Sequence, residues 1–297
     1  MWQPLIKGLQ EGDFKSLARC ISLVENEVPG SETFLQELPP SSVPVIGITG
    51  PPGAGKSTLV DALIEEIVSG GKKIAVLCVD PSSPFNLGAV LGDRIRMNEW
   101  YNHPRVFIRS LATRGSLGGL HPRILEITDV CKAAGFDYVL VETVGVGQSE
   151  IEITGLADAT VVVLVPEAGD EVQTMKAGLM EIADLFVINK ADRPDADLFV
   201  KNLRQMLAPS FKANRPELPI IKTVATQKKG THELWQKIDA FLQSAPYNEQ
   251  KSWLLAEKAY QLIQQKRMKD INKAALKESI KQELDHSFNL YRFVARY

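Results

Sequence analysis

Cysteine is scarce in this chain of 297 residues, which holds only Cys20, Cys78 and Cys131. The three residues are far apart, their number is odd, and no C-x-x-C pair occurs. Such spacing argues against both a disulfide framework and a zinc site. The pattern fits a reducing compartment, so we expect a cytoplasmic protein.

Long hydrophobic runs and an excess of one charge are missing as well. No stretch approaches the ~20 apolar residues of a membrane span, and the first residues do not form the apolar core of a signal peptide. The 34 basic and 36 acidic residues give a net charge of −2. This balance gives no general electrostatic argument for a nucleic acid or an anionic membrane as partner. We expect neither.

One segment is rich in glycine. Residues 50–58 match G-x-x-x-x-G-K-[ST] and directly follow the apolar residues 45–48. The glycines let backbone N–H groups face a phosphate chain, while Lys56 adds a positive charge and Ser57 offers a hydroxyl to Mg²⁺. A helix from Lys56 to about Ser69 would direct its positive end at the same anion. The residues expected to bind a nucleotide here are Gly50, Pro51, Pro52, Gly53, Ala54, Gly55, Lys56, Ser57 and Thr58.

Short β-branched runs alternate with helical segments from residue 43 onward. Several runs are apolar throughout, as in strands that are buried on both faces. The pattern predicts an α/β fold with a doubly wound, mainly parallel sheet, and ligands at the carboxyl ends of its strands. The expected strands are Val45–Thr49, Ile74–Val79, Val106–Ser110, Tyr138–Glu142, Thr160–Val165, Leu185–Asn189 and Ile220–Val224.

Helical sequence flanks this α/β domain, which we place at residues 43–245. Residues 1–42 carry apolar side chains at helical spacing and predict a helical N-terminal extension. Residues 246–297 predict a helical C-terminal arm that ends in several aromatic residues. Such an apolar surface needs a cover. The arm could fold back on its own domain, but a second copy of the chain is favoured, giving a symmetric homodimer.

Acidic residues follow several of the predicted strands. Glu142 ends one strand and Gly145 comes three residues later, the arrangement with which a P-loop NTPase orients water and senses the γ-phosphate. Asp80 and Asp93 are candidate metal or switch carboxylates. A turn aspartate and a helix N-cap, respectively, are equally good interpretations of these two.

Two later loops hold further charged candidates. Asp170 could cap a helix that carries Lys176 toward the nucleotide or across a subunit contact. From the spacing alone, a capped, solvated helix is the favoured interpretation. Arg114, in the glycine-containing loop 113–119, could contact phosphate or a partner, or belong to an ordinary surface loop.

Asn189, Lys190 and Asp192 complete an N-K-x-D element at the end of a strand. Guanine presents two N–H donors that one carboxylate, Asp192, accepts, whereas adenine would leave that carboxylate unpaired. Asn189 and Lys190 would hold the loop and cover the ring. Val224 and Ala225 follow the last strand and could supply a backbone N–H to the guanine carbonyl. GTP is therefore favoured over ATP.

Together these motifs resemble the MeaB/ArgK family of P-loop GTPases. The resemblance spans the chain, and its most specific part is the run E-T-V-G-V-G-Q-S-E at residues 142–150. It also includes V-D-P-S-S at 79–83, L-G-D-R-I-R-M at 91–97 and G-S-L-G-G at 115–119. Members of this family are GTPase chaperones of adenosylcobalamin-dependent acyl-CoA mutases. They gate cofactor loading, protect the mutase and dimerise through C-terminal helices.

The resemblance also implies roles for single residues. Lys56 and Ser57 would serve phosphate and Mg²⁺, and residues 142–150 and 169–178 would be switch segments. Adenosylcobalamin would be met only through the partner mutase. The implied metal set is Ser57, Asp80, Asp93 and Glu142. Independently of the resemblance, the residues that we expect to be catalytic are Lys56, Glu142, Gly145, Asp170 and Lys176.

We expect slow GTP hydrolysis that a mutase partner stimulates. Val146 follows Gly145 where common small GTPases carry the glutamine that positions water, so a stimulating group must move in, and Asp170 and Lys176 are the candidates. A nickel-type metallochaperone GTPase is one alternative, although the four scattered histidines form no ligand cluster. A small-molecule kinase linked to basic amino-acid transport is a second, and a GTP-dependent scaffold is a third.

Overall fold

The computed structural model describes residues 2–80, 97–114, 120–145, 150–168, 182–207, 218–244, 249–268, 270–284 and 288–297. The chain divides into two compact units, Met1–Tyr247 and Asn248–Tyr297. The first unit contains the sheet, and the second is helical. Among the residues described, no helix is both long and apolar enough to cross a membrane.

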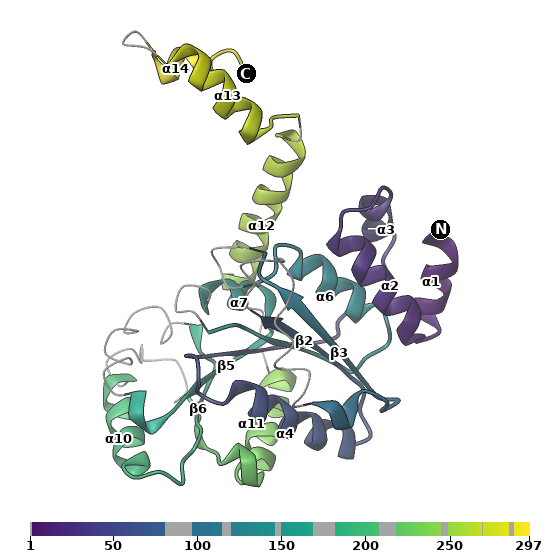
Figure 1. Cartoon of the computed structure of the whole chain (residues 1–297). Helices are drawn as coiled ribbons and strands as arrows, with labels where there is room; N and C mark the ends of the chain where they lie inside the picture. Colours follow the sequence, from purple (N-terminus) through teal and green to yellow (C-terminus); the bar gives the residue numbers. More distant parts are fainter. Residues whose placement is uncertain are drawn as a thin grey trace. The chain divides into compact units, whose positions relative to one another are not determined.

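A seven-stranded sheet forms the centre of the first unit (Figure 1). Its order is β3-β2-β4-β1-β5-β6-β7, and all neighbouring strands run parallel. The predicted doubly wound sheet is confirmed. Because β1 lies between β4 and β5, the winding reverses there, which favours a ligand crevice at its carboxyl end. The strands are β1 (Val45–Thr49), β2 (Ile74–Asp80), β3 (Val106–Ala112), β4 (Tyr138–Glu142), β5 (Ala159–Leu164), β6 (Leu185–Ile188) and β7 (Ile220–Lys222).

Helices cover both faces of the sheet. One face carries α4 (Lys56–Ser69) and α11 (Thr231–Ser244), and the other carries α6 (Ile124–Lys132) and α7 (Glu150–Leu156) (Figure 1). Val45 and Ile46, consecutive in β1, belong to opposite core clusters. Since successive side chains of a strand point to opposite faces, burial of both faces explains why the strands are apolar throughout. A third cluster packs β6 against α10 (Ala196–Leu207).

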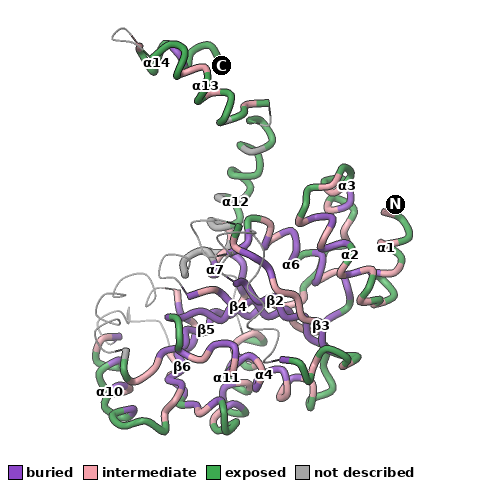
Figure 2. Tube along the Cα trace, viewed as in Figure 1, coloured by how far each residue is buried: buried purple, intermediate pink, exposed green. Residues whose placement is uncertain are grey.

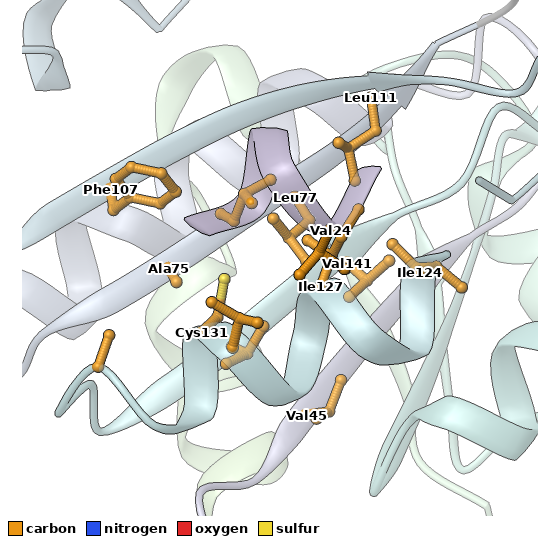
Figure 3. Packing of buried hydrophobic residues seen from close by; sticks show 14 of the residues in the cluster. Val24, Val45, Ala75, Leu77, Phe107, Leu111, Ile124, Ile127, Cys131 and Val141 are labelled. Carbon is orange, nitrogen blue, oxygen red and sulfur yellow. The ribbon is translucent and has the colours of Figure 1, made fainter. Parts of the chain in front are cut away.

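Three N-terminal helices extend one of these layers: α1 (Trp2–Gln10), α2 (Phe14–Glu25) and α3 (Ser31–Gln36). Ile21 and Val24 of α2 are buried with Leu77 of β2 and Ile127 of α6. Figure 3 shows Val24 among these packed side chains. The expected N-terminal helices are present, and they share the hydrophobic core of the sheet.

The second unit consists of α12 (Glu249–Arg267), α13 (Lys273–Glu283) and α14 (Leu290–Val294). Phe293 is buried within it, and Arg296 pairs with Glu283 at 2.6 Å. Most of its described residues are exposed (Figure 2). Among its described residues, the exposed large apolar side chains are Leu255, Tyr260, Leu262, Ile263, Met268, Leu284, Leu290, Tyr291, Val294 and Tyr297.

Candidate functional site

The glycine-rich loop joins the end of β1 to the start of α4. Gly50 has a φ of 138°, and a Cβ there would run into the carbonyl oxygen of Val163. Gly55 has a φ of 86°, and a Cβ there would meet the side-chain amide of Asn189. Both positions therefore need glycine for backbone conformation and for close packing. The first N–H groups of α4 follow at once, which is the arrangement that binds anions.

Lys56 is buried beside this loop. Its Nζ donates to the carbonyl oxygens of Gly50 at 2.9 Å and Pro51 at 3.1 Å. Gly145 has a φ of 86° and lies against the same ammonium group, so that a Cβ there would be 2.5 Å from Lys56 Nζ. The lysine and the residues after β4 thus meet at one point.

Hydroxyl and carboxylate groups connect β1, β4 and α4. Ser57 Oγ donates to Glu142 Oε1 at 2.7 Å. The hydroxyls of Thr49 and Thr143 share a hydrogen bond of 2.9 Å, and Thr143 N donates to Ile48 O at 3.0 Å. These side chains are all buried, so the carboxyl ends of the two strands are held in a defined register.

A cavity of about 430 Å³ opens at this edge of the sheet. Asp80, at the end of β2, is buried and lines the cavity together with Ser57 and Glu142. Their oxygen atoms are of the ligand type that Mg²⁺ prefers, so this donor set fits that ion. The volume suits a small polar ligand. The lining residues are Pro52, Gly53, Gly55, Lys56, Ser57, Thr58, Val79, Asp80, Glu142, Thr143, Val144 and Lys190.

Asn189 joins the loop after β6 to two other loops. Its Nδ2 donates to Ala54 O at 2.9 Å, and its Oδ1 accepts the backbone N–H of Ala225 at 3.2 Å. Lys190 Nζ donates to Gly53 O at 2.7 Å. Asn189 and Lys190 of the predicted base-binding set therefore contact the glycine-rich loop, and Ala225 contacts Asn189.

Asp192 and Val224 complete the predicted base-binding set. Asp192 is in an exposed turn, and Val224 follows β7. Of the five residues in this set, Lys190 alone lines the cavity. β6 and β7 end at Ile188 and Lys222, short of the expected ends at Asn189 and Val224, and the residues beyond them form the loops of the site.

Several predicted residues fall outside the described part of the chain. They are Asp93, Asp170 and Lys176, and the roles given to them stay predictions. The same holds for the structure of residues 146–149 and 169–178 within the predicted switches. Arg114 is described, and it bonds to Glu25 at the end of α2 at 2.9 Å.

Three threonines of the site were not among the residues predicted from sequence: Thr49, Thr143 and Thr223. Besides the Thr49–Thr143 bond, Thr223 Oγ1 donates to Asn189 Oδ1 at 3.1 Å. Each threonine ends or directly follows a strand that leads into the site. That position is the signal by which they could have been found.

A protein-family model described as methylmalonyl Co-A mutase-associated GTPase MeaB matches residues 17–280. The chain belongs to the MeaB family. The predicted family membership is thereby confirmed, and the glycine-rich loop and its cavity are those of a GTPase family.

Individual relatives agree with the MeaB assignment. A protein of Pyrococcus horikoshii, provisionally named a GTPase, is 49% identical over 241 residues, which cover 79% of this chain and 75% of the relative. The mitochondrial methylmalonic aciduria type A homolog of Caenorhabditis briggsae is 38% identical over 235 residues, covering 73% and 57%. The crystal structure of a LAO/AO transport system kinase matches with a TM-score of 0.68 at 27% identity, covering 96% and 93%.

Proposed function

We propose that this MeaB-family chain is a cytoplasmic, Mg²⁺-dependent GTPase that serves an adenosylcobalamin-dependent acyl-CoA mutase of the methylmalonyl-CoA type. In this role it gates loading of the cofactor and protects the mutase, and it meets cobalamin only through that partner. The family's description as a mutase-associated GTPase and the name of the Caenorhabditis briggsae relative support this proposal.

The observation that carries the hydrolytic part is the 2.7 Å bond between Ser57 and Glu142 in the wall of the cavity. Water attacks the γ-phosphorus of GTP, and the bond to the GDP oxygen breaks. Lys56 and the loop N–H groups offset the phosphate charge, Glu142 orients the water, and the Gly145 N–H contacts the γ-phosphate. Mg²⁺, held by Ser57, Asp80 and Glu142, would neutralise further phosphate charge.

A direct test combines the purified chain with a purified apo-mutase. We expect GTP hydrolysis that requires Mg²⁺, is slow alone and rises at least about tenfold with the mutase. Cofactor loading, followed by the visible absorbance of cobalamin, should differ between GTP and a non-hydrolysable analogue. Unchanged hydrolysis and unchanged loading with the mutase would rule out the partner assignment.

The stimulating group can be tested in the same assay. We assign it to Lys176, with Asp170 as its companion, because Val146 takes the place of the water-positioning glutamine. Lys176→Ala should lose the stimulated rate and keep the basal rate. Lys201→Ala, which removes an exposed lysine from α10, is the control. A fully stimulated Lys176→Ala enzyme would contradict the assignment.

Base selection is assigned to Asp192. In Asp192→Asn, an amide N–H faces the guanine donors, and GDP affinity should fall about 10- to 100-fold. Xanthosine diphosphate offers an acceptor where guanine has a donor. It should therefore bind Asp192→Asn more tightly than it binds the wild-type chain. Titration with fluorescent nucleotides measures the affinities for GDP and for xanthosine diphosphate. Asp195→Asn, which makes the same charge change three residues away, is the control. Equal GDP affinity in wild type and Asp192→Asn would speak against this role.

A second candidate is a small-molecule kinase linked to basic amino-acid transport. The name of the LAO/AO transport system kinase favours it. A kinase would transfer the γ-phosphoryl group to an acceptor other than water. Incubation with γ-labelled GTP and basic amino acids decides between the two, because hydrolysis releases all the label as inorganic phosphate.

A further inference from the structure

Glu25, the last residue of α2, lies close to three side chains that carry nitrogen donors. Arg109 belongs to β3, Arg114 follows β3, and His121 precedes α6. Glu25 Oε1 accepts Arg114 Nη2 at 2.9 Å, and its Oε2 accepts Arg109 Nη2 at 3.0 Å. His121 Nε2 lies 3.7 Å from Oε1. The Glu25 side chain is only 13% exposed, so these contacts are screened less than surface ion pairs.

Arg114 is held at the end of α2 by more than this one bond. Its Nη1 donates to the backbone carbonyl of Glu25 at 3.2 Å, and its Nη2 also donates to Asn26 Oδ1 at 3.2 Å. Its φ of 48° is a left-handed conformation that residues other than glycine rarely adopt. The fork of hydrogen bonds holds the backbone in this conformation.

His121 lies just before α6 and faces the same carboxylate. It is buried, and its Nδ1 accepts the backbone N–H of Arg123 at 3.0 Å. Nε2 therefore carries the proton in the neutral ring, and that N–H faces Glu25. Arg114 and His121 precede and follow residues 115–119 in the sequence, and both face the carboxylate of Glu25.

The backbone leads from Arg114 directly to the cavity. Ala112, the last residue of β3, pairs with Asp80, and Thr113 N donates to Asp80 O at 3.1 Å. Asp80 lines the cavity. Arg114, which Glu25 holds, is thus adjacent to Thr113, whose backbone N–H bonds to the carbonyl oxygen of Asp80.

We propose that Glu25 is a positioning residue for GTP hydrolysis. Through Arg114 it sets the backbone of Thr113, and through Thr113 the placement of the Asp80 carboxylate toward Mg²⁺. The N-terminal helices thereby contribute to the metal end of the site, although they supply no side chain to the cavity. This inference rests on the proposed Mg²⁺-dependent GTPase function.

The test is a Mg²⁺ titration of GTP hydrolysis in Glu25→Gln. This substitution keeps the shape of the side chain and removes the charge that holds Arg114. The Mg²⁺ concentration for half-maximal hydrolysis should rise about fivefold. GDP affinity in the presence of a chelator should stay within about twofold, because the glycine-rich loop and the base-binding loop are untouched.

Glu27→Gln is the matched control. Glu27 is two residues away and pairs with Arg123 at 2.7 Å, but its side chain is 66% exposed. It should titrate like wild type. Arg114→Lys, which keeps the charge and loses the fork, should reproduce the shift of Glu25→Gln and applies the same test if Glu25→Gln does not fold.

Three results would contradict the assignment of Glu25 as a positioning residue. If Glu25→Gln and Arg114→Lys melt at lower temperature but titrate like wild type, Glu25 is only structural and the inference is wrong. The same follows if Glu27→Gln shifts equally. If the wild-type chain shows no Mg²⁺-dependent hydrolysis, the proposed function fails, and the inference fails with it.

Discussion

Gly145 illustrates how one hydrogen atom in place of a methyl group keeps the phosphate site open. A Cβ there would lie 2.5 Å from Lys56 Nζ and overlap the carbonyl oxygen of Gly50. Gly135 has a similar φ of 76° with open space around it. Gly145→Ala and Gly135→Ala both strain the backbone by about 1–2 kcal/mol. Only the first displaces the lysine.

We therefore expect Gly145→Ala to slow GTP hydrolysis by about 100-fold, because small displacements of reacting groups are costly. Gly135→Ala should hydrolyse GTP like wild type and lose only stability. Steady-state kinetics and chemical denaturation of both variants separate the two effects. Equal rates in the two variants would show that strain alone, and not the displaced lysine, matters.

His121 makes the stability of the fold dependent on pH. Burial lowers its pKa below the ordinary value of about 6.5, while Glu25 acts in the opposite direction and Arg114 adds to the lowering. Below pH 6.5 the unfolded chain binds a proton that the folded chain excludes. The free energy of unfolding should therefore fall from pH 6.5 downward, by at most about 1.4 kcal/mol per pH unit from this group.

Urea denaturation of wild type and His121→Gln between pH 7.5 and 5 measures this contribution. The difference between the two proteins isolates His121 from the carboxylates that titrate in the same range. The variant should show the shallower loss of stability toward acid. Parallel curves for both proteins would exclude His121 as the source.

The sequence shows that α2 has an apolar face, but it does not show that this face packs against the layer of β2 and α6. Ile21 of α2 is fully buried against the sheet layer. Ile21→Ala should lower the free energy of unfolding by about 2–5 kcal/mol, because it leaves a cavity in a shared core. Leu198→Ala, at a side chain 54% exposed on α10, should cost less than about 0.5 kcal/mol. A small loss for Ile21→Ala would mean that the N-terminal helices fold apart from the sheet.

The strands and α4 were predictable because their signals are local. Apolar runs at residues 45–49 and 138–142 predict buried parallel strands. The glycine-rich pattern places Lys56 and Ser57 at the start of a helix. The Ser57–Glu142 meeting also followed, since the carboxyl ends of parallel strands share one edge.

Contacts that depend on distant packing were not predictable. Arg114 and Glu25 are 89 residues apart, and no spacing rule relates a loop arginine to the end of an earlier helix. The amphipathic pattern of residues 1–42 showed that an apolar face exists, but not which surface it covers. The Thr49–Thr143 bond likewise depends on the register of β1 and β4, which sequence patterns leave open.

For the chain as a whole, we propose that the second unit forms a homodimer. Tyr260 and Ile263 are 63% and 52% exposed, and they lie one turn apart on α12. Apolar patches of this kind mark interfaces. The full chain should sediment as a dimer at micromolar concentration, and Tyr260→Glu combined with Ile263→Glu should sediment as a monomer.

Leu198→Glu is the control for this experiment, because it places a glutamate at an exposed apolar position of the first unit. It should leave the sedimentation of the chain unchanged. A monomeric wild-type chain, or a dimeric double variant, would remove the basis for the proposal.

The bond from Asn189 to Ala54 spans 135 residues, and that of Lys190 to Gly53 spans 137. During synthesis on the ribosome the glycine-rich loop is therefore made long before the residues that support it. At ~5–20 residues per second, the delay is roughly 7 to 27 seconds. A nascent chain that stalls before residue 189 holds the whole phosphate-binding motif but cannot close the loop around a nucleotide. GTP binding thus reports that translation has passed residue 190.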